Sequence, residues 1–259
     1  MPLLDLPPEL RLRIYEHLPA FDHAHRRDIT INARDALTPA ISRCSRQLRT
    51  ETLPLYARSA HFAIPLDEHS THTAYHYGPV DTWLDALGES GVAKLQSLQL
   101  SQHWQIAQPT RGQTHVGFYI RLVQTGQGGL NAAGWRCTTG TYPIANDIRG
   151  MRLESVELLE RHVVSYLRWA YQTYLRWGGV EVKRKPIEAL DLSRSDLDYV
   201  MKAMGIIARH PISTYDLHQD QAGRQVRRGT FDKMDNELIE LGRGYGFNPR
   251  QQGTFHTPY

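Results

Sequence analysis

The feature that most constrains the fold is a long amphipathic stretch at residues 152–177. Its apolar residues keep the 3.6-residue period of an α-helix for about seven turns, and two glycines follow it. Glutamates lie near its start and arginines near its end, as the helix dipole favours. We therefore expect a helix here, with its aromatic residues packed against a sheet. The apolar positions are Leu153, Val156, Leu159, Val163, Leu167, Ala170 and Tyr174.

The middle of the chain has the alternating pattern of β-strands. Residues 116–122 alternate strictly between apolar and other side chains, and residues 135–142 follow across the glycine-rich segment 126–134. These two runs predict a hairpin. Shorter strand signals occupy residues 29–31, 59–64 and 94–104, the second of them stopped by Pro65.

Shorter helical patterns complete the chain. Residues 80–88 predict a helix with Gly88 near its C-cap, and residues 196–209 and 231–241 predict two more. The tail from Gly242 is expected to lie as a loop over the surface. A change from helical to alternating pattern near residue 57 divides the chain into a helical segment, 1–56, and a body, 57–259, which together predict an α+β fold.

The N-terminal segment begins with a well-marked helix. Pro7 and Pro8 suit a first helical turn, and Leu10, Ile14 and Leu18 then recur every four residues as a narrow apolar stripe. A second helix is expected from about residue 38, with Ile41, Cys44 and Leu48 on one face and with Pro54 ending or kinking it.

Composition excludes several classes of protein. The chain has 259 residues, 30 basic against 27 acidic side chains and a net charge of +3. The basic residues are scattered, which does not favour nucleic-acid binding. No apolar run approaches the roughly 18 residues that cross a bilayer, and the first residues do not resemble a signal peptide. We expect a cytoplasmic or nuclear protein without a membrane partner.

Few residues suggest catalytic or metal chemistry. His69, His72 and His76 would suit zinc by residue type, but serine, threonine and a Gly-Pro pair around them indicate a solvated loop. No G-x-S-x-G nucleophile motif occurs. The two cysteines, Cys44 and Cys137, are explained as small buried hydrophobes. The expectation is a protein that is not an enzyme, with no catalytic residue, cofactor or metal.

The first helix carries a resemblance to a known family. The run from Leu6 to Leu18, Leu-Pro-Pro-Glu-Leu-Arg-Leu-Arg-Ile-Tyr-Glu-His-Leu, resembles the first helix of an F-box. With the preceding Leu-Asp and the later Ser-Arg-Cys-Ser-Arg-Gln-Leu-Arg-Thr-Glu-Thr-Leu-Pro-Leu-Tyr, it is similar to a group of fungal F-box-like proteins. The similarity covers residues 3–66 well, 80–100 loosely and the rest hardly at all.

The resemblance implies a substrate-recognition subunit of an SCF-type cullin–RING ubiquitin ligase, whose body binds an unknown protein target. It also implies an α+β fold in which an F-box-like helical segment packs with a small, mostly antiparallel sheet and C-terminal helices. Cys44 and Leu48 would support the first helix from the second. The residues that would partly face a Skp-type adaptor are Leu6, Pro7, Leu10, Ile14, Tyr15 and Leu18.

Two alternatives stay open at this stage. The insertion at residues 19–38, and Leu48 in place of the usual tryptophan, allow a self-contained interaction or effector-like protein whose N-terminal helices are core. The second alternative is an unrecognised metal protein or enzyme that uses His69, His72 and His76. Exposure of Leu10, Ile14 and Leu18 in the isolated chain would favour the adaptor-binding interpretation, and burial would favour the self-contained one.

Overall fold

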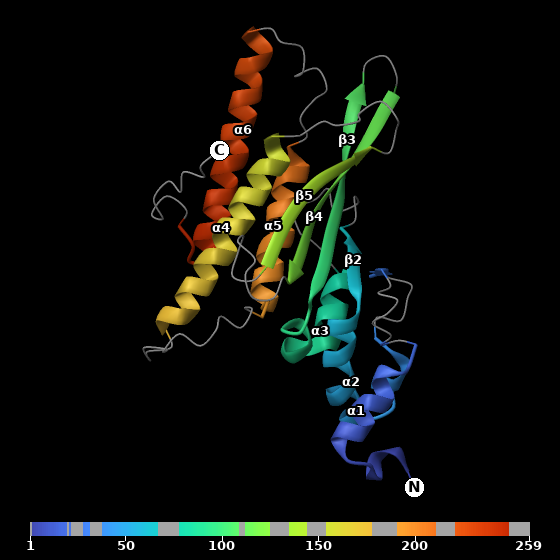
Figure 1. Cartoon of the computed structure of the whole chain (residues 1–259). Coiled ribbons are helices and arrows are strands. Elements are labelled where there is room, and N and C mark those ends of the chain that lie inside the picture. Colours follow the sequence, from blue (N-terminus) through green and yellow to red (C-terminus); the bar gives the residue numbers. More distant parts are fainter. Residues whose placement is uncertain are drawn as a thin grey trace.

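The computed structural model of the chain describes residues 2–19, 21, 28–31, 38–66, 78–108, 112–124, 135–143, 154–177, 191–210 and 221–248. Within them, helices at both ends of the chain flank one sheet, so the fold is α+β (Figure 1). The short N-terminal helices lie at one tip of the molecule, and the three long C-terminal helices lie together beside the sheet. No helix in the described ranges is both long and apolar enough to cross a bilayer.

The sheet has five strands in the order β1-β2-β3-β4-β5. β1 (Asp28–Thr30), β2 (His61–Pro65) and β3 (Ser97–Gln108) pair in parallel. β4 (Gly112–Gln124) and β5 (Trp135–Pro143) continue the sheet by longer antiparallel pairings. The predicted hairpin of residues 116–122 and 135–142 is confirmed by the β4–β5 pairing. The edge strand β1 comes from the N-terminal segment, although the sheet belongs to the body.

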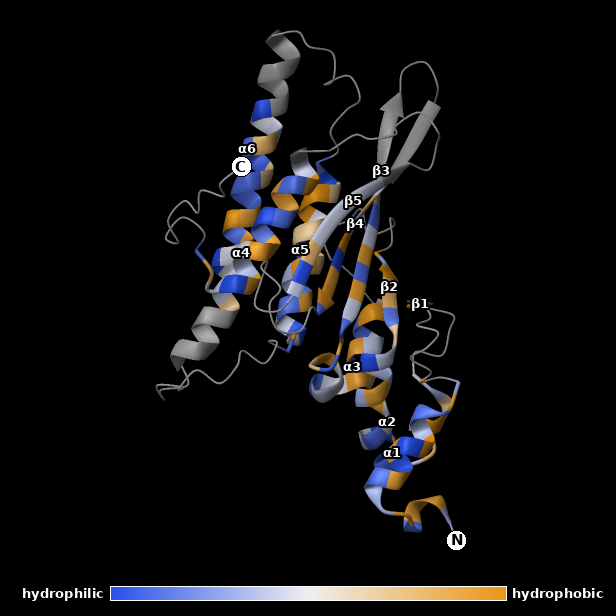
Figure 2. Ribbon diagram, in the orientation of Figure 1, coloured by the Kyte–Doolittle hydropathy of each residue, from blue (hydrophilic) through white to orange (hydrophobic). Residues whose placement is uncertain are grey.

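One face of the sheet is apolar because alternate residues of each strand point to the same side. Residues paired across strands share a face, and the pairs Phe62–Leu98, Leu100–Ile120 and Leu122–Cys137 are all buried. Figure 2 shows hydrophobic and hydrophilic residues alternating along the strands. This face receives the helices of the body.

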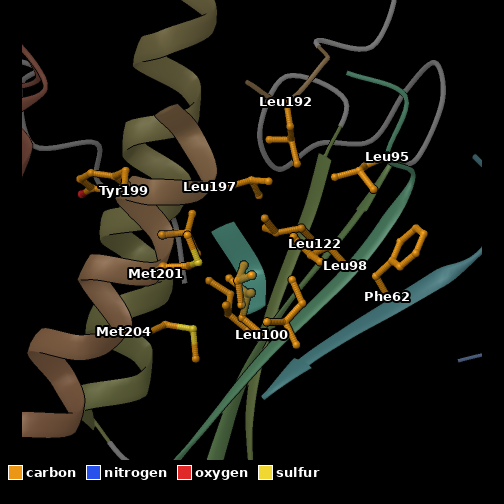
Figure 3. Close-up of a cluster of buried hydrophobic side chains, with 14 of the residues drawn as sticks. Phe62, Leu95, Leu98, Leu100, Leu122, Leu192, Leu197, Tyr199, Met201 and Met204 are labelled. Atoms are coloured by element: carbon orange, nitrogen blue, oxygen red, sulfur yellow. The ribbon is translucent and has the colours of Figure 1, made fainter. Parts of the chain in front are cut away.

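Three long helices lie on the apolar side of the sheet. α4 (Glu154–Trp177) contacts β5, α5 (Arg194–Arg209) contacts β3, and α6 (Gln221–Gly244) packs on both α4 and α5. A capping box between Ser193 and Asp196 starts α5. In Figure 3, Met201 and Met204 of α5 extend toward the leucines of the sheet. The predicted long amphipathic helix therefore forms and covers the sheet.

Two shorter helices link the N-terminal segment to this core. α2 (Arg46–Ser59) is capped by Ser45, whose hydroxyl accepts from the Leu48 amide at 3.1 Å. α3 (Gly78–Val92) is interrupted at Gly88, where φ of 66° bends the helix. Phe62 of β2 lies between Tyr56 of α2 and Trp83 of α3, with ring centroids 5.2 and 4.9 Å apart. The buried side chains form one continuous cluster from Tyr15 to Phe247.

The structure corrects several expectations about element ends. α2 continues through Pro54, which therefore does not end it, and a 3-10 turn (Ala40–Arg43) precedes it in place of regular helix. Ser59 belongs to α2 and not to the following strand. α6 starts ten residues earlier than predicted, at Gln221 instead of 231.

The chain after α6 also differs from the prediction of a surface loop. Phe247 is fully buried, and its amide donates to the Gly242 carbonyl at 2.8 Å, so the chain turns back onto α4. Trp169 of α4 packs on Phe247 with a centroid distance of 5.6 Å, so its partner is this turn and not the expected sheet.

Candidate functional site

The most distinctive surface feature is a set of three exposed hydrophobic side chains at the N-terminal tip. Among the residues that the structure describes, the exposed large hydrophobics are Leu4, Leu10 and Ile14, with 42%, 49% and 41% of their surface accessible. All three come from the first 3-10 turn, η1 (Leu3–Asp5), and from α1 (Pro8–Glu16). We refer to Leu4, Leu10 and Ile14 as the N-terminal apolar surface.

Local sequence explains why α1 starts and stops where it does. Pro7 is the N-cap and Pro8 occupies the first helical position, where a missing amide hydrogen costs nothing. Glu9 lies in the first turn, where its negative charge suits the helix dipole. Beyond Glu16 the chain turns, and Phe21 is fully buried. The predicted helix from the Pro-Pro-Glu run is confirmed.

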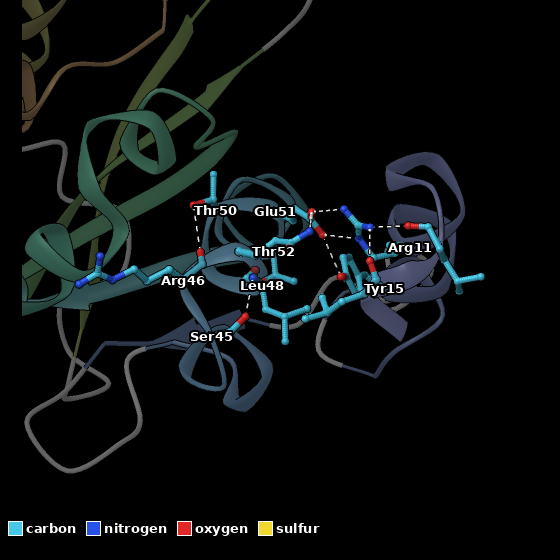
Figure 4. Close-up of polar contacts among 11 residues, drawn as sticks. Arg11, Tyr15, Ser45, Arg46, Leu48, Thr50, Glu51 and Thr52 are labelled. Atoms are coloured by element: carbon cyan, nitrogen blue, oxygen red, sulfur yellow. Dashed lines mark hydrogen bonds and ion pairs between the residues drawn. The ribbon is translucent and has the colours of Figure 1, made fainter. Parts of the chain in front are cut away.

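The adjacent face of α1, which carries Arg11 and Tyr15, is fixed to α2 by a polar network (Figure 4). Arg11 and Tyr15, one helical turn apart on α1, are buried and both bind the Glu51 carboxylate of α2. The Arg11 guanidinium donates through Nε at 3.1 Å and through a terminal nitrogen at 2.5 Å, which is a bidentate arrangement. The Tyr15 hydroxyl donates at 2.9 Å and the Gln47 amide at 3.2 Å. The Glu51 carboxylate thus accepts four hydrogen bonds.

These bonds change the protonation behaviour of the network. The hydrogen bonds from Arg11 lower the pKa of Glu51 to about 2, against a partial opposing effect of burial. Burial, followed by the hydrogen bond to Glu51, raises the pKa of Tyr15. The carboxylate is therefore ionised and the phenol neutral throughout the physiological range, so the network is stable to ordinary pH changes.

Arg11 also orders the first residues of the chain. Its second terminal nitrogen donates to the Leu4 carbonyl at 3.1 Å and to the Leu6 carbonyl. These carbonyls belong to the 3-10 turn η1 and its C-cap, which have no further helix to bond to. One buried guanidinium therefore holds both η1 and α1 against α2, and it leaves Leu4, Leu10 and Ile14 on the outside.

The structure divides the six residues that the F-box resemblance implied. Pro7, Leu10 and Ile14 are exposed, and Leu6 and Leu18 are half-buried. Tyr15 is fully buried against Glu51, so it belongs to the support of α1 and not to its outer surface. This is a correction, and no local sequence pattern shows it because Tyr15 and its partner Glu51 are 36 residues apart.

Three contributors to the tip are not visible in the sequence pattern. Leu4 has no periodic signal because it lies in a 3-10 turn, and the spacing on α1 places Arg11 among the polar residues. Glu51 belongs to the segment that resembles the F-box-like proteins, but nothing in that segment indicates its role. The only sequence signal for this network is an arginine and a tyrosine four residues apart on one helix, with a single glutamate on the next helix.

The remaining predicted residues have mixed outcomes. Leu48 of α2 is buried as expected, and Cys137 is buried in β5. Cys44 is exposed, which corrects the prediction that it is a buried hydrophobe, because it follows the 3-10 turn and lies outside α2. His69, His72 and His76 lie outside the described residues.

Comparison with protein-family models, with curated proteins and with solved structures finds no match to this chain. Its function is therefore inferred from the residues and geometry described above.

Proposed function

We propose that this chain is a non-catalytic, F-box-like substrate receptor of an SCF-type cullin–RING ubiquitin ligase. In this proposal the N-terminal apolar surface docks into a Skp-type adaptor, and the body from about residue 57 binds the protein target. The observation that supports it is the exposure of Leu10 and Ile14 on a helix whose neighbouring face is held by buried polar bonds. These are two of the residues that the F-box resemblance assigns to the adaptor.

Two positions of α1 depart from the pattern of an ordinary surface helix. A helix packed on a protein body normally turns its apolar stripe inward and its charges outward. In α1 a buried arginine faces the body, while a leucine and an isoleucine face water. Because full burial of such a side chain is worth about 1.5–3 kcal/mol, burying the remaining half of each gives roughly 1 kcal/mol per residue. A partner with an apolar groove would gain this free energy.

The chemistry of α1 fits a helix-in-groove interaction. Leu10 and Ile14 are one turn apart, the spacing at which a helix presents anchors to a groove between partner helices. The bonds from Arg11 to Glu51 hold the helix in place before binding, which reduces the entropy lost on docking.

The self-contained alternative accounts for only part of the same helix. Tyr15 and Leu48 belong to the buried cluster, as that alternative expects. Leu10 and Ile14 do not, and they have 49% and 41% of their surface exposed. The alternative therefore offers no reason for the apolar stripe to face water.

Co-expression with a Skp-type adaptor, followed by gel filtration and titration calorimetry, tests the proposal. The wild-type chain should co-elute with the adaptor. Leu10→Asp and Ile14→Asp should each weaken binding at least about tenfold, since a charge would be buried in an apolar groove. Each variant should melt within a few degrees of wild type because the substituted side chain is exposed in the isolated chain.

Two matched controls separate binding from folding. Leu10→Met keeps an apolar anchor and should bind as wild type does. Glu16→Arg changes charge on α1 away from Leu10 and Ile14, and it should also retain binding. Absence of wild-type co-elution, or unfolding of the isolated chain by Leu10→Asp, would reject the proposal and favour the self-contained alternative.

A further inference from the structure

The second face of the sheet carries exposed polar side chains. Residues that alternate with the buried ones on β4 and β5 point away from α4 and α5. Of these, Arg121, Arg136 and Thr138 are exposed, and Tyr119 is half-buried. They lie on neighbouring strands, since Arg121 pairs directly with Thr138 and Tyr119 with Gly140. We call Tyr119, Arg121, Arg136 and Thr138 the open-face cluster.

The two arginines make this cluster strongly cationic. Arg121 pairs with Thr138, and Arg136 is two residues from Thr138 on β5, so the arginines are diagonal neighbours about 7–8 Å apart. Neither guanidinium has a hydrogen bond or ion pair within the described part of the chain. β2, β3, β4 and β5 contain no aspartate or glutamate at all. Asp28 is on β1, three strands from β4. Two adjacent like charges on strands that contain no carboxylate favour an anionic partner.

Tyr119 supplies a flat aromatic surface in the same cluster. A Cβ atom placed on Gly140 would lie 2.6 Å from the Tyr119 hydroxyl oxygen and 2.7 and 2.8 Å from two ring carbons. The ring therefore lies down across β5 on the space that the glycine leaves free, which is a recurrent way of covering a glycine in a sheet.

We propose that the open-face cluster binds single-stranded nucleic acid, with a base stacked on Tyr119 and a phosphate held by Arg121 and Arg136. Tyr119 and Arg121 are two residues apart on one strand, about 7 Å along the sheet. A flat ring and a bidentate cation at this separation match the two recurrent chemical groups of a nucleotide, its base and its phosphate. An acidic peptide would use the arginines but would have no group that requires a flat ring.

This inference goes beyond the ligase proposal and uses different residues. The expectation against nucleic acid rests on net charge and on basic residues scattered along the sequence. Arg121 and Arg136 are 15 positions apart in the chain and become neighbours only through the β4–β5 pairing. A single-strand site depends on such local charge and on stacking more than on the total charge of the chain.

Fluorescence anisotropy with the full-length protein tests this site. The probes are labelled oligouridylate and oligothymidylate of about 12 nucleotides, a duplex of the same length, and a labelled polyglutamate peptide. Wild type should bind at least one single strand more tightly than the duplex or the peptide. Arg121→Gln with Arg136→Gln should lower the magnitude of the slope of log affinity against log salt by up to about 1.4, or about 0.7 for each phosphate that is no longer neutralised.

Substitutions at Tyr119 separate stacking from charge. Tyr119→Leu should weaken binding about tenfold with an unchanged salt slope, whereas Tyr119→Phe keeps the ring and should bind like wild type. The pair Arg58→Gln with Arg228→Gln removes equal charge from exposed sites on α2 and α6, and it should have no effect.

Several results would overturn the proposal. They are no single-strand binding by wild type at low salt, equal binding of the duplex or of polyglutamate, and equal weakening in the Arg58 and Arg228 control. None of these bears on the adaptor, whose binding should be unaffected by the substitutions in the sheet. Conversely, Leu10→Asp should leave nucleic-acid binding intact, so failure of one proposal is distinguishable from failure of the other.

Discussion

At the scale of single residues, Arg11 has the largest influence on the N-terminal tip. It is the residue through which η1, α1 and α2 are joined, and it achieves this with bonds to one carboxylate and two carbonyls. Since a lysine has one compact charged group and cannot form the same fork, the geometry requires arginine. The exposure of Leu10 and Ile14 is a direct result of Arg11 facing inward.

The Glu51 carboxylate gives this network a defined pH dependence. Its pKa falls from 4.5 to about 2 in the folded chain, so the unfolded state binds a proton more readily. The stability that the ionised Glu51 contributes is fully present above about pH 4.5 and is lost as the pH falls toward 2. Glu51→Gln should lower stability at neutral pH and reduce the loss between these two pH values. Urea unfolding measured across this range checks the prediction.

A matched substitution controls for the removal of one carboxylate. Glu16 is an exposed glutamate of α1 outside the network, and Glu16→Gln should keep the wild-type pH dependence. If Glu51→Gln unfolds with the same acid dependence as wild type, the coupling between Arg11 and Glu51 is not present in solution.

At the scale of secondary-structure elements, the sequence pattern predicts that a helix or strand forms better than it predicts where that element starts and ends. The hairpin of β4 and β5 is predictable because strict alternation at 116–122 has no helical counterpart. Helix α4 is predictable because its stripe is long. The start of α6 is not, since residues 221–230 are mostly polar and lack an apolar period. Nor is the passage of α2 through Pro54, which depends on tertiary contacts that override local preference.

The orientation of α1 shows what periodicity leaves undetermined. A stripe at Leu10, Ile14 and Leu18 predicts a helix with one apolar side, but it does not state whether that side meets the same chain or another one. The answer depends on Glu51, whose position opposite Arg11 is a tertiary fact. Of the six residues that the resemblance to F-box helices implied, Pro7, Leu10 and Ile14 are exposed, whereas Tyr15 is fully buried.

The turn after α6 is predicted to be a major anchor of the C-terminal helices. Phe247 is fully buried and its ring packs on Tyr166 and Trp169, at centroid distances of 5.9 and 5.6 Å. Phe247→Ala should cost about 3–5 kcal/mol of stability by leaving a cavity between α4 and α6. Chemical denaturation measures this directly.

A substitution of Tyr245, in the same turn, should destabilise the protein less than Phe247→Ala and serves as a comparison. Its hydroxyl donates to Asp198 and accepts from Lys202 at 3.0 Å, and its ring contacts Tyr166 and Tyr199. Tyr245→Phe removes only the hydroxyl and should cost about 1 kcal/mol. Equal destabilisation by the two variants would mean that the aromatic packing of Phe247 is not the main contribution.

At the scale of the whole molecule, two faces with different chemistry lie on different elements. The N-terminal apolar surface is on η1 and α1, and the open-face cluster is on β4 and β5 (Figure 1). One continuous buried cluster runs between the regions that carry them. A partner on the first face would therefore be held in a fixed geometry relative to whatever binds the second.

The placement of β1 makes the first 56 residues inseparable from the rest. Asp28–Thr30 pairs with His61–Ala63, and the Ile31 amide adds a bond of 2.8 Å to the Ala63 carbonyl. A chain shortened to residues 57–259 would leave β2 with unpaired amides and carbonyls along its outer side. Such a strand recruits strands from other molecules, so the shortened chain should self-associate where the full chain does not. Sedimentation velocity of the two forms at matched concentration would decide this, and a monodisperse short form would mean that the first strand is dispensable.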